Sequence, residues 1–416
     1  MSQILLKNFD LLDVAEGVLK SGHQVLVNDG VFVEVSKGAI KAAEAEVVDL
    51  GGRTLMPGLI DCHCHVTSTK VKRGTWAAIG MLPSIIAATA GKTLREMLMR
   101  GFTTIRDAAG ADLGHKQAVE QGLFVGPRMF VSGRGLSQTG GHGDLRSRAD
   151  LAPPCGCNFG GSTRIADGVT AVRQAARDEI RLGADQIKVM ASGGVSSPAD
   201  PIDFLQYSMD ELKAIVDEAT RSHTYVLAHT YTAEAIKRCV EAGIRTIEHG
   251  NFIDEAAAMM MAKAGAYFVP TLITYRKLVD LGAQFGLQDH ALEKAKEVLA
   301  VGTRSLEVAK RAGVKVAFGT DLVGVELHQH QSEEFLVRAE VWSPAEIIRS
   351  ATLISAEVVR MEGKLGVIAP GALADALIVD GNPLEDLGLM QDQGAHFPAI
   401  MKDGAWVKNT LDGTLA

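Results

Sequence analysis

The sequence has little cysteine, no excess of basic residues and no long apolar run. Five Cys in 416 residues are too few for a fold stabilised by disulfides, and their odd number leaves at least one thiol free. Forty-two Lys and Arg against 50 Asp and Glu give a net charge of −8, so binding to nucleic acid is not expected. No stretch approaches the ~18 uninterrupted apolar residues that predict a membrane-spanning helix.

Residues 1–10 (MSQILLKNFD) lack the features of a secretion signal, because no basic segment leads into an apolar one. Free thiols and the missing signal together favour a reducing compartment. We therefore expect a cytoplasmic protein that binds neither membrane nor nucleic acid.

The remaining composition is that of a globular protein, with 47% hydrophobic and 22% charged residues. Short runs rich in β-branched residues alternate with amphipathic segments, as strands and helices do in α/β proteins. Two helices are expected at Ser208–Arg221, which opens with the capping box Ser208-x-x-Glu211, and at Glu293–Ala312. The expected strands are Leu59–Val66, Thr103–Ala108, Arg128–Ser132, Gln186–Ala191, Tyr225–Tyr231, Thr246–Gly250, Tyr267–Leu272 and Lys315–Asp321.

Eight such strands in about 260 residues predict a (β/α)8 barrel, which typically runs to ~250 residues. A doubly wound open sheet is the alternative architecture. The two ends, 1–56 and 364–416, alternate with a short period like antiparallel strands, and we expect them to form one small β-sandwich domain beside a barrel of residues 57–363. Residues 133–168 show no period and predict a long functional loop on the active-site face.

Two histidines stand at the end of the first expected strand, in residues 61–65 (DCHCH). Alternation along a strand places His63 and His65 on one face and Cys62 and Cys64 on the other, toward the outer helices. Paired imidazoles at a barrel mouth suit metal ligation, whereas the two cysteines are expected to be small core residues. Cys155 and Cys157 have no second pair at zinc-site spacing, so no function is assigned to them.

Lys188 lies inside an apolar strand, QIKVMA, and alternation directs it toward the barrel axis. An unpaired ammonium there would be costly, so it needs a partner or a changed charge. From this residue alone, a buried ion pair is the simpler interpretation.

Three further strands end on a polar residue: His229 closes VLAH, His249 closes TIEH and Asp321 closes VAFGTD. Barrel geometry brings the carboxyl ends of the strands to one cavity, so these residues should meet the first two histidines and Lys188 there. Imidazoles and charges that converge in this way predict a metal cluster.

With these residues the sequence resembles the amidohydrolase superfamily, in its branch of imidazolonepropionase and the metal-dependent prolidases, over essentially the whole chain. Residues 56–65, MPGLIDxHxH, are similar to the family's signature on the first strand. Residues 365–375, LGxIxPGxxAD, followed by NPL at 382–384, are similar to its C-terminal return into the small β domain.

The resemblance implies two divalent metal ions, with Zn2+ the usual metal, bridged by a carboxylated lysine and a hydroxide. Lys188 falls where binuclear members carry that lysine, and mononuclear deaminase-type members lack it. The implied ligands are His63, His65, Lys188, His229, His249 and Asp321.

Two residues are expected to contact substrate. His142, in the glycine-rich TGGHG segment of the long loop, is placed to donate to a developing oxyanion. Tyr231 stands two residues past His229 and so faces the same cavity; in similar enzymes such a tyrosine binds the free carboxylate of the substrate. The alternative for His142 is a solvated loop histidine, and the alternative for Tyr231 is a tyrosine that packs at the barrel rim.

Several other residues are weaker candidates. An arginine could bind an anionic group of the substrate. Tyr275 and Trp342 could line the pocket or pack between helices, and packing is the simpler role for Trp342. The arginines considered are Arg106, Arg134, Arg146 and Arg148.

Together these residues predict a binuclear metal-dependent hydrolase of amide bonds in small molecules. Asp321 would move a proton from the hydroxide to the leaving nitrogen, with His142 at the carbonyl oxygen. The preferred substrates are Xaa-Pro dipeptides and N-acyl-proline, cleaved by a homo-oligomer. The loop Ile273–Leu287 carries only Asp280 among acids, which argues against a basic leaving group, although Glu326, Glu333 and Glu334 weaken that argument.

Three alternatives stay open: a dipeptidase for C-terminal Arg or Lys, a cyclic-amide hydrolase, and a catalytically silent barrel acting in assembly. Silent relatives lose ligands, whereas all of the implied ligands are present in this chain.

Overall fold

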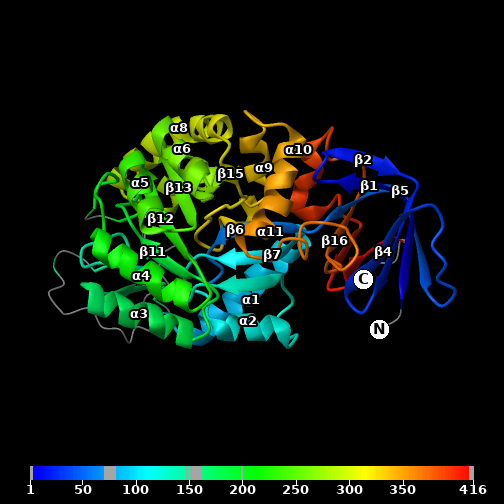
Figure 1. The fold of residues 1–416 in the computed structure, drawn as a ribbon, viewed down its shortest axis with the longest axis horizontal. Coiled ribbons are helices and arrows are strands. Elements are labelled where there is room, and N and C mark those ends of the chain that lie inside the picture. The colour runs from blue at the N-terminus through cyan, green and yellow to red at the C-terminus, as the bar shows by residue number, and fades with distance from the viewer. Residues whose placement is uncertain (1–2, 70–80, 147–148, 150–160, 198–199, 412–416) are drawn as a thin grey trace.

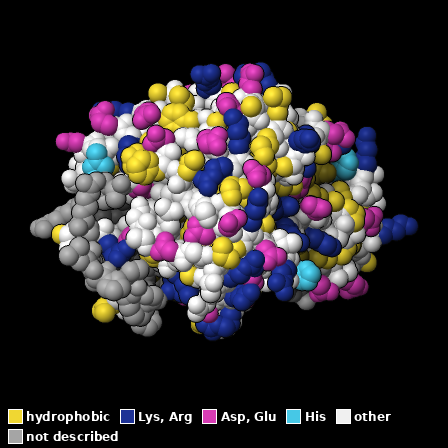
Figure 2. Space-filling model, turned by 60° about the vertical axis from the view of Figure 1, so that its left-hand side comes forward, with side chains coloured by type: hydrophobic (Ala, Val, Ile, Leu, Met, Phe, Trp, Pro, Cys, Tyr) yellow, Lys and Arg dark blue, Asp and Glu magenta, His cyan; other side chains and the backbone are white. Residues whose placement is uncertain are grey.

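The computed structural model describes residues 3–69, 81–146, 149, 161–197 and 200–411 (Figure 1). Cys155, Cys157 and Arg148 lie outside the described residues. No helix of the described segments is both long enough and apolar enough to cross a bilayer. Over the face shown in Figure 2, Lys and Arg side chains are interspersed with Asp and Glu.

The centre of the chain forms parallel sheet. Within the described residues, one sheet has three strands in the order β6 (Leu59–Cys64), β7 (Phe102–Asp107), β8 (Arg128–Val131). The other has seven, in the order β10 (Thr163–Ile165), β9 (Gly135–Ser137), β11 (Ile187–Met190), β12 (Val226–Thr232), β13 (Thr246–Phe252), β14 (Tyr267–Val269), β15 (Lys315–Val316). The α/β class with parallel strands is thereby confirmed.

Backbone hydrogen bonds connect the two sheets at two places. The amide of Cys62 in β6 donates to Phe318 O, just past β15, at 2.8 Å. At the second place, Asp185 N, two residues before β11, donates to Val131 O in β8, also at 2.8 Å. The eighth expected strand pairs over only two residues, Lys315 and Val316. The chain just beyond it still contacts the first strand, through the hydrogen bond at Phe318.

The segment 133–168 departs from expectation. It was predicted to be a loop without regular structure, but β9 and β10 lie in it and pair in parallel. The prediction was wrong because strands of three residues are too short to produce a recognisable period.

Helices connect the strands and cover the outer face of the seven-stranded sheet. Val189, Ala228 and Ile247 of the sheet form one buried cluster with Ile215 and Ile236 of the helices. The described helices are α1 (Pro83–Met99), α2 (Leu113–Glu120), α3 (Val169–Arg181), α4 (Met209–Arg221), α5 (Ala233–Ala242), α6 (Glu255–Ala264), α7 (Leu272–Leu281), α8 (Asp289–Ala312), α9 (Glu333–Arg338), α10 (Pro344–Arg349) and α11 (Ser355–Val358).

Helix α4 begins where the capping box predicts. Ser208 accepts a hydrogen bond from the amide of Glu211, and the Glu211 side chain accepts one from the amide of Ser208. Helix α8 begins earlier than expected, at Asp289, and ends before Gly313, whose φ of 74° is left-handed. The first turn of α8 was not predicted, because polar residues there interrupt the apolar period.

Both ends of the chain join one further sheet, of eight strands among the described residues. Figure 1 shows its blue and red strands together on the side away from the green helices. The strands are β1 (Ile4–Asp13), β2 (Val18–Ser21), β3 (His23–Asn28), β4 (Val31–Lys37), β5 (Glu46–Pro57), β16 (Ala376–Val379), β17 (Ala399–Lys402) and β18 (Ala405–Asn409).

The N-terminal strands do not form a simple antiparallel meander. β1 pairs with β3 antiparallel but with β5 parallel, and β5 then pairs with β16 antiparallel. Alternation of side chains looks alike in both kinds of pairing, so the sequence did not distinguish them. The boundaries 1–56, 57–363 and 364–416 stay a prediction, as does the sandwich.

One glycine of the C-terminal motif is fixed by a close approach. Gly366 has a φ of 69°, and an added Cβ would lie 2.5 Å from the carbonyl carbon and oxygen of Thr352. Gly363, three residues earlier, has the same φ of 69°, yet its added Cβ would meet no atom within 4 Å. A substitution at either position would strain the left-handed backbone. Only at Gly366 would the new side chain also collide with other atoms.

We predict that Gly366→Ala lowers the free energy of unfolding by about 1–3 kcal/mol more than Gly363→Ala does, because only the first forces a side chain against backbone. Urea denaturation of both variants, followed by circular dichroism, measures the difference. Equal losses in the two variants would contradict the steric explanation.

Candidate metal centre and substrate pocket

One cavity at the carboxyl ends of the parallel strands collects every predicted site residue. Its volume of about 340 Å³ suits a small molecule. His63 comes from β6, with His65 just beyond it, Lys188 from β11, His229 and Tyr231 from β12, and His249 from β13. The predicted residues that line it are His63, His65, His142, Lys188, His229, Tyr231, His249 and Asp321.

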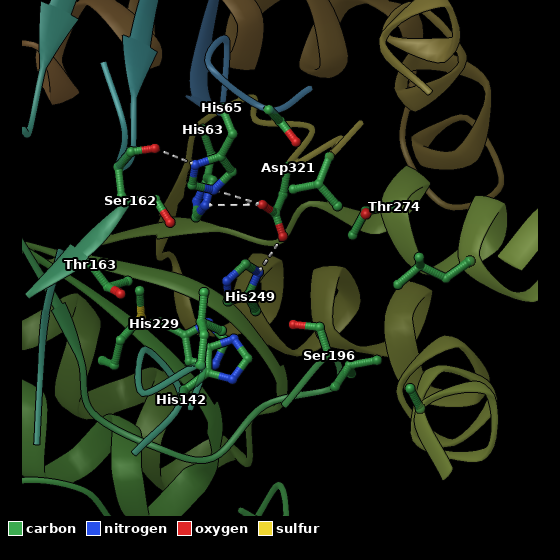
Figure 3. Close-up of a pocket in the computed structure, with 18 of the residues that line it drawn as sticks. His63, His65, His142, Ser162, Thr163, Ser196, His229, His249, Thr274 and Asp321 are labelled. Carbon is green, nitrogen blue, oxygen red and sulfur yellow. Dashed lines mark hydrogen bonds and ion pairs between the residues drawn. The ribbon is translucent and has the colours of Figure 1, made fainter. Parts of the chain in front are cut away.

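Four of these residues point toward one another in Figure 3. His65 Nε2 lies 3.0 Å from Asp321 Oδ1, and His63 Nε2 lies 3.4 Å from the same oxygen. His249 Nδ1 lies 3.8 Å from the other carboxylate oxygen. One donor atom from each of His63, His249 and Asp321 falls within 4.8 Å of the others, which is the spacing of ligands around a metal ion.

Unusual backbone conformations aim two of these side chains. His249 has a φ of 68° and Asp321 a φ of 52°, both in the left-handed region that non-glycine residues rarely adopt. Thr271, with a φ of 49°, contacts His249 Nδ1 through its hydroxyl at 2.8 Å. Backbone strain of this kind concentrates at functional sites, where the surrounding structure maintains it.

The second nitrogen of each histidine from the first strand is held by an acceptor. His63 Nδ1 donates to Glu248 Oε2 at 2.7 Å, and His65 Nδ1 donates to Ala109 O at 2.8 Å. These hydrogen bonds assign the proton to Nδ1 and leave each Nε2 as a lone-pair donor facing the cavity.

Charge and burial also favour metal binding. Burial lowers the pKa of His249 to about 3 and that of His63 well below its usual value, so both are neutral near pH 7. Burial alone would raise the pKa of Asp321, but the neighbouring histidines hold it below its usual value. Neutral imidazoles beside an ionised carboxylate are the forms that bind divalent metals.

Lys188 is buried in the wall of this cavity, with 1% of its surface exposed. Among the described residues it has no hydrogen bond and no ion pair, so the simpler interpretation of a buried ion pair is wrong. Burial lowers the pKa of its amine to about 8. A buried amine without a partner needs either a ligand or a chemical change.

His229 and His142 stack on each other next to His249, whose ring centroid is 4.6 Å from that of His229. The ring centroids of the stacked pair are 4.2 Å apart with the planes inclined by 12°. His142 Nδ1 lies 2.7 Å from Ser197 Oγ, and the His142 backbone amide donates to Gln206 Oε1 at 2.9 Å. His142 therefore takes its position from the loop that follows β11.

Tyr231 and Tyr275 line the same cavity, and their hydroxyls are hydrogen-bonded to each other at 2.8 Å. A pair of linked hydroxyls has one proton to spare for an acceptor in the cavity. Trp342 is not among the lining residues; it packs between two apolar clusters.

The three candidate arginines that the structure describes do not reach the cavity. Arg106 is fully buried and its guanidinium pairs with Glu248 at 2.8 Å, so it is a structural residue. Arg134 pairs with Glu179 and Arg146 with Asp144. No arginine lines the cavity among the described residues.

The acids after the eighth strand are not open to substrate either. Glu334 is fully buried and pairs with Arg338, and Glu333 pairs with Lys277. Neither these two nor Glu326 lines the cavity, and Asp321 is its sole acidic residue within the described part of the chain.

The sequence reasoning missed Glu248. It is fully buried in β13 and accepts hydrogen bonds from both His63 and Arg106. The signal was present, because Glu248 is a charged residue inside an apolar strand, as Lys188 is. Other missed lining residues are Thr67, Ser68, Ser162, Thr163, Ser196, Thr274, Gln288 and His290, whose types are common in any loop.

Comparison with known proteins identifies the family to which the chain belongs. Residues 54–414 match the amidohydrolase family. The chain belongs to that family. Members generally use a divalent metal centre to hydrolyse their substrates, and the group formed by His63, His249 and Asp321 is able to hold one.

Relatives of this amidohydrolase match most of its length. Ochratoxinase of Aspergillus niger is 34% identical over 357 residues, 82% of this chain and 73% of the relative. A prolidase solved with N-methylphosphonate-L-proline is 49% identical, with a TM-score of 0.95 over 98% of this chain and 100% of that one. An Xaa-Pro dipeptidase solved with bound methionine is 29% identical, with a TM-score of 0.88 over 98% and 100%.

We predict that Glu248→Gln weakens zinc binding about 10–100-fold, because the neutral amide no longer holds His63 as a carboxylate does. Titration of metal-free protein with Zn2+ in a calorimeter measures the affinity. Glu357→Gln is the matched control, since that carboxylate bonds Tyr267 at the start of β14, away from the cavity. Unchanged zinc affinity in Glu248→Gln, with the fold intact by circular dichroism, would contradict the orienting role.

Proposed function

We propose that this amidohydrolase is a binuclear metal-dependent hydrolase that cleaves Xaa-Pro dipeptides and N-acyl-proline. The observation that carries the hydrolytic function is the convergence of His63, His65, His249 and Asp321 with the unpaired amine of Lys188 in one cavity. The likeness to a prolidase and to an Xaa-Pro dipeptidase supports the choice of substrate.

The architecture we propose is a single (β/α)8 barrel of residues 57–363 with a small β-sandwich domain made from 1–56 and 364–416. The hydrogen bonds from Cys62 to Phe318 and from Asp185 to Val131 support closure, because they join the two parallel sheets at two separate places. We also propose a cytoplasmic homo-oligomer, as the sequence predicts.

Two divalent ions, with Zn2+ the expected metal, would be held by His63, His65, Lys188, His229, His249 and Asp321. When bound, they supply Lewis acidity that polarises the amide carbonyl and activates water near neutral pH. The donor set fits such ions, because imidazole nitrogens and carboxylate oxygens are common zinc ligands.

Lys188 would take part as a carbamate. Its neutral amine adds to the carbon of CO2, one N–H proton passes to solvent, and the product is an anion with two oxygens. The lowered pKa of Lys188 supports this step, because only the neutral amine is a nucleophile. A carbamate also removes the cost of an unpaired buried ammonium.

Asp321 and His142 would manage protons at the scissile amide. Asp321 is held in its ionised form, so it can accept a proton from the attacking water and deliver it to the leaving nitrogen. When the Ser197 hydroxyl donates to His142 Nδ1, the imidazole carries its proton on Nε2. That N–H would donate to the oxygen on which negative charge develops.

The wall of the cavity favours a small apolar leaving group. Leu145, Val195, Leu278, Leu287 and Val323 line it, and Asp321 is its sole acid among the described residues. A C-terminal Arg or Lys would need a carboxylate that the described part of this wall does not offer.

Tyr231 is our choice for the partner of the free carboxylate, since no arginine of the described chain reaches the cavity. An Xaa-Pro bond is a tertiary amide without an N–H, so recognition depends on ring shape and on that carboxylate.

Ochratoxin is the second substrate to test, because ochratoxinase is a relative at 34% identity and the apolar wall suits a bulky acyl group. Cyclic amides and dipeptides ending in Arg or Lys complete the panel. A silent barrel would bind no metal and hydrolyse none of these compounds.

We predict that Lys188→Ala loses most of its bound metal and its activity, because it removes the group that would bridge both ions. Elemental analysis of the purified variant beside the wild type measures metal content. Incubating metal-free wild-type protein with bicarbonate and Zn2+ should restore activity, whereas Lys188→Ala should not respond. Full metal content with retained activity in the variant would overturn the bridging role.

We predict that the wild-type enzyme hydrolyses Met-Pro and N-acetyl-proline, and that kcat/KM falls about 10–150-fold for Met-Pro-amide, the equivalent of ~1.5–3 kcal/mol for a lost charge-assisted hydrogen bond. Tyr231→Phe should reduce activity on Met-Pro and abolish the discrimination between acid and amide. The release of free proline measures all of these rates.

Two results would redirect the proposal. Met-Arg hydrolysed faster than Met-Pro would establish the dipeptidase for basic residues instead. Undiminished discrimination between Met-Pro and Met-Pro-amide in Tyr231→Phe would assign the carboxylate to another residue.

A further inference from the structure

A lysine outside the cavity binds the loop that forms part of its wall. Lys294 projects from the second turn of α8, and its ammonium donates to three backbone carbonyls, Gly194 O at 2.9 Å, Ser197 O at 3.1 Å and Asp200 O at 2.8 Å. An ammonium has three N–H donors, so these contacts use all of them.

The carbonyls that Lys294 holds belong to residues in contact with His142. The Gly194 backbone lies against the imidazole, since an added Cβ would be 2.1 Å from His142 Cε1. Ser197 contacts His142 Nδ1 through its hydroxyl at 2.7 Å. Val195, between them, lines the cavity.

The same loop holds the backbone of His142 by a second route. Gln206 accepts from the His142 amide at 2.9 Å and donates to Asp200 Oδ2 at 2.9 Å. Asp200 is buried, with 1% of its surface exposed, and its carbonyl is one of the three bound by Lys294. Both routes to His142 therefore pass through residues that the ammonium fixes.

The geometry also depends on the charge. Three carbonyl oxygens that converge on one point repel one another unless a cation or several donors lie between them. A neutral side chain at position 294 would leave these acceptors to solvent and release the loop from α8.

We infer that Lys294 is a positioning residue that fixes the loop after β11, and through it the ring of His142, in the orientation that hydrolysis requires. The inference rests on the role proposed above for His142. Lys294 does not line the cavity, so its effect on substrate is indirect.

The first test uses the metal-loaded enzyme with Lys294→Ala. We expect kcat/KM for N-acetyl-proline to fall about 10–100-fold with metal content unchanged, because small misplacements of a catalytic group reduce rates by that order. Lys296→Ala is the matched control on the same helix, where the lysine forms an exposed ion pair with Glu293. Wild-type activity in Lys294→Ala would overturn the inference.

Chemical rescue distinguishes the cation from general stability. Propylammonium replaces the atoms that Lys294→Ala removes, so it should restore part of the lost activity. Tetramethylammonium has no N–H donor and should not. Equal effects of the two salts would overturn the requirement for the three hydrogen bonds.

A double-mutant cycle tests whether Lys294 acts through His142. In a His142→Ala background, Lys294→Ala should cause less than about a threefold further loss, since the residue it positions is already gone. Losses that multiply in the double variant would show that Lys294 acts elsewhere and would overturn the inference.

Hydrogen exchange separates this inference from the proposed function. Peptides covering 192–207 should exchange faster in Lys294→Ala than in the wild type and in Lys296→Ala, and propylammonium should slow them again. If the wild-type enzyme cleaves no proline amide, the proposed function fails while this measurement still tests the link between α8 and the loop. Unchanged exchange would overturn the link itself.

Discussion

The buried pair of Arg106 and Glu248 is the interaction on which the rest of the site depends. Arg106, on β7, donates to Cys62 O of β6, to the Thr246 hydroxyl and to both oxygens of Glu248 on β13. It therefore joins the three-stranded sheet to the seven-stranded one beneath the cavity. Glu248 in turn holds His63, so one guanidinium fixes both the spacing of the sheets and the direction of a candidate ligand.

Much of the architecture could be predicted because its elements are amphipathic and strongly delimited. Helix α4 begins at the capping box of Ser208, and the parallel strands follow the apolar runs. What the sequence could not give was pairing. The parallel contact of β1 with β5 and the short strands β9 and β10 depend on partners distant in the chain, which leave no mark on local periodicity.

The location of the site was predictable for a similar reason: a polar residue that closes an apolar strand must face the cavity at the end of a parallel sheet. That rule predicted a shared cavity for His229, His249 and Asp321, and all three line one in the structure. Residue type alone misled for Arg106, which was considered for an anionic group of the substrate, because the sequence does not reveal that its partner Glu248 lies on another strand. It also gave no sign of Lys294, since a lysine that binds backbone carbonyls looks in sequence like any exposed lysine.

The pairing of β5 with β16 has a consequence for the newly made chain. Leu55 and Ile378 are partners in that sheet although about 320 residues separate them, which a ribosome needs roughly 16–65 s to add at ~5–20 residues per second. During that time β5 presents an unpaired apolar edge, the surface from which strand-to-strand aggregation starts. The most hazardous period for this protein thus falls during translation, and it ends when the C-terminal strands leave the ribosome.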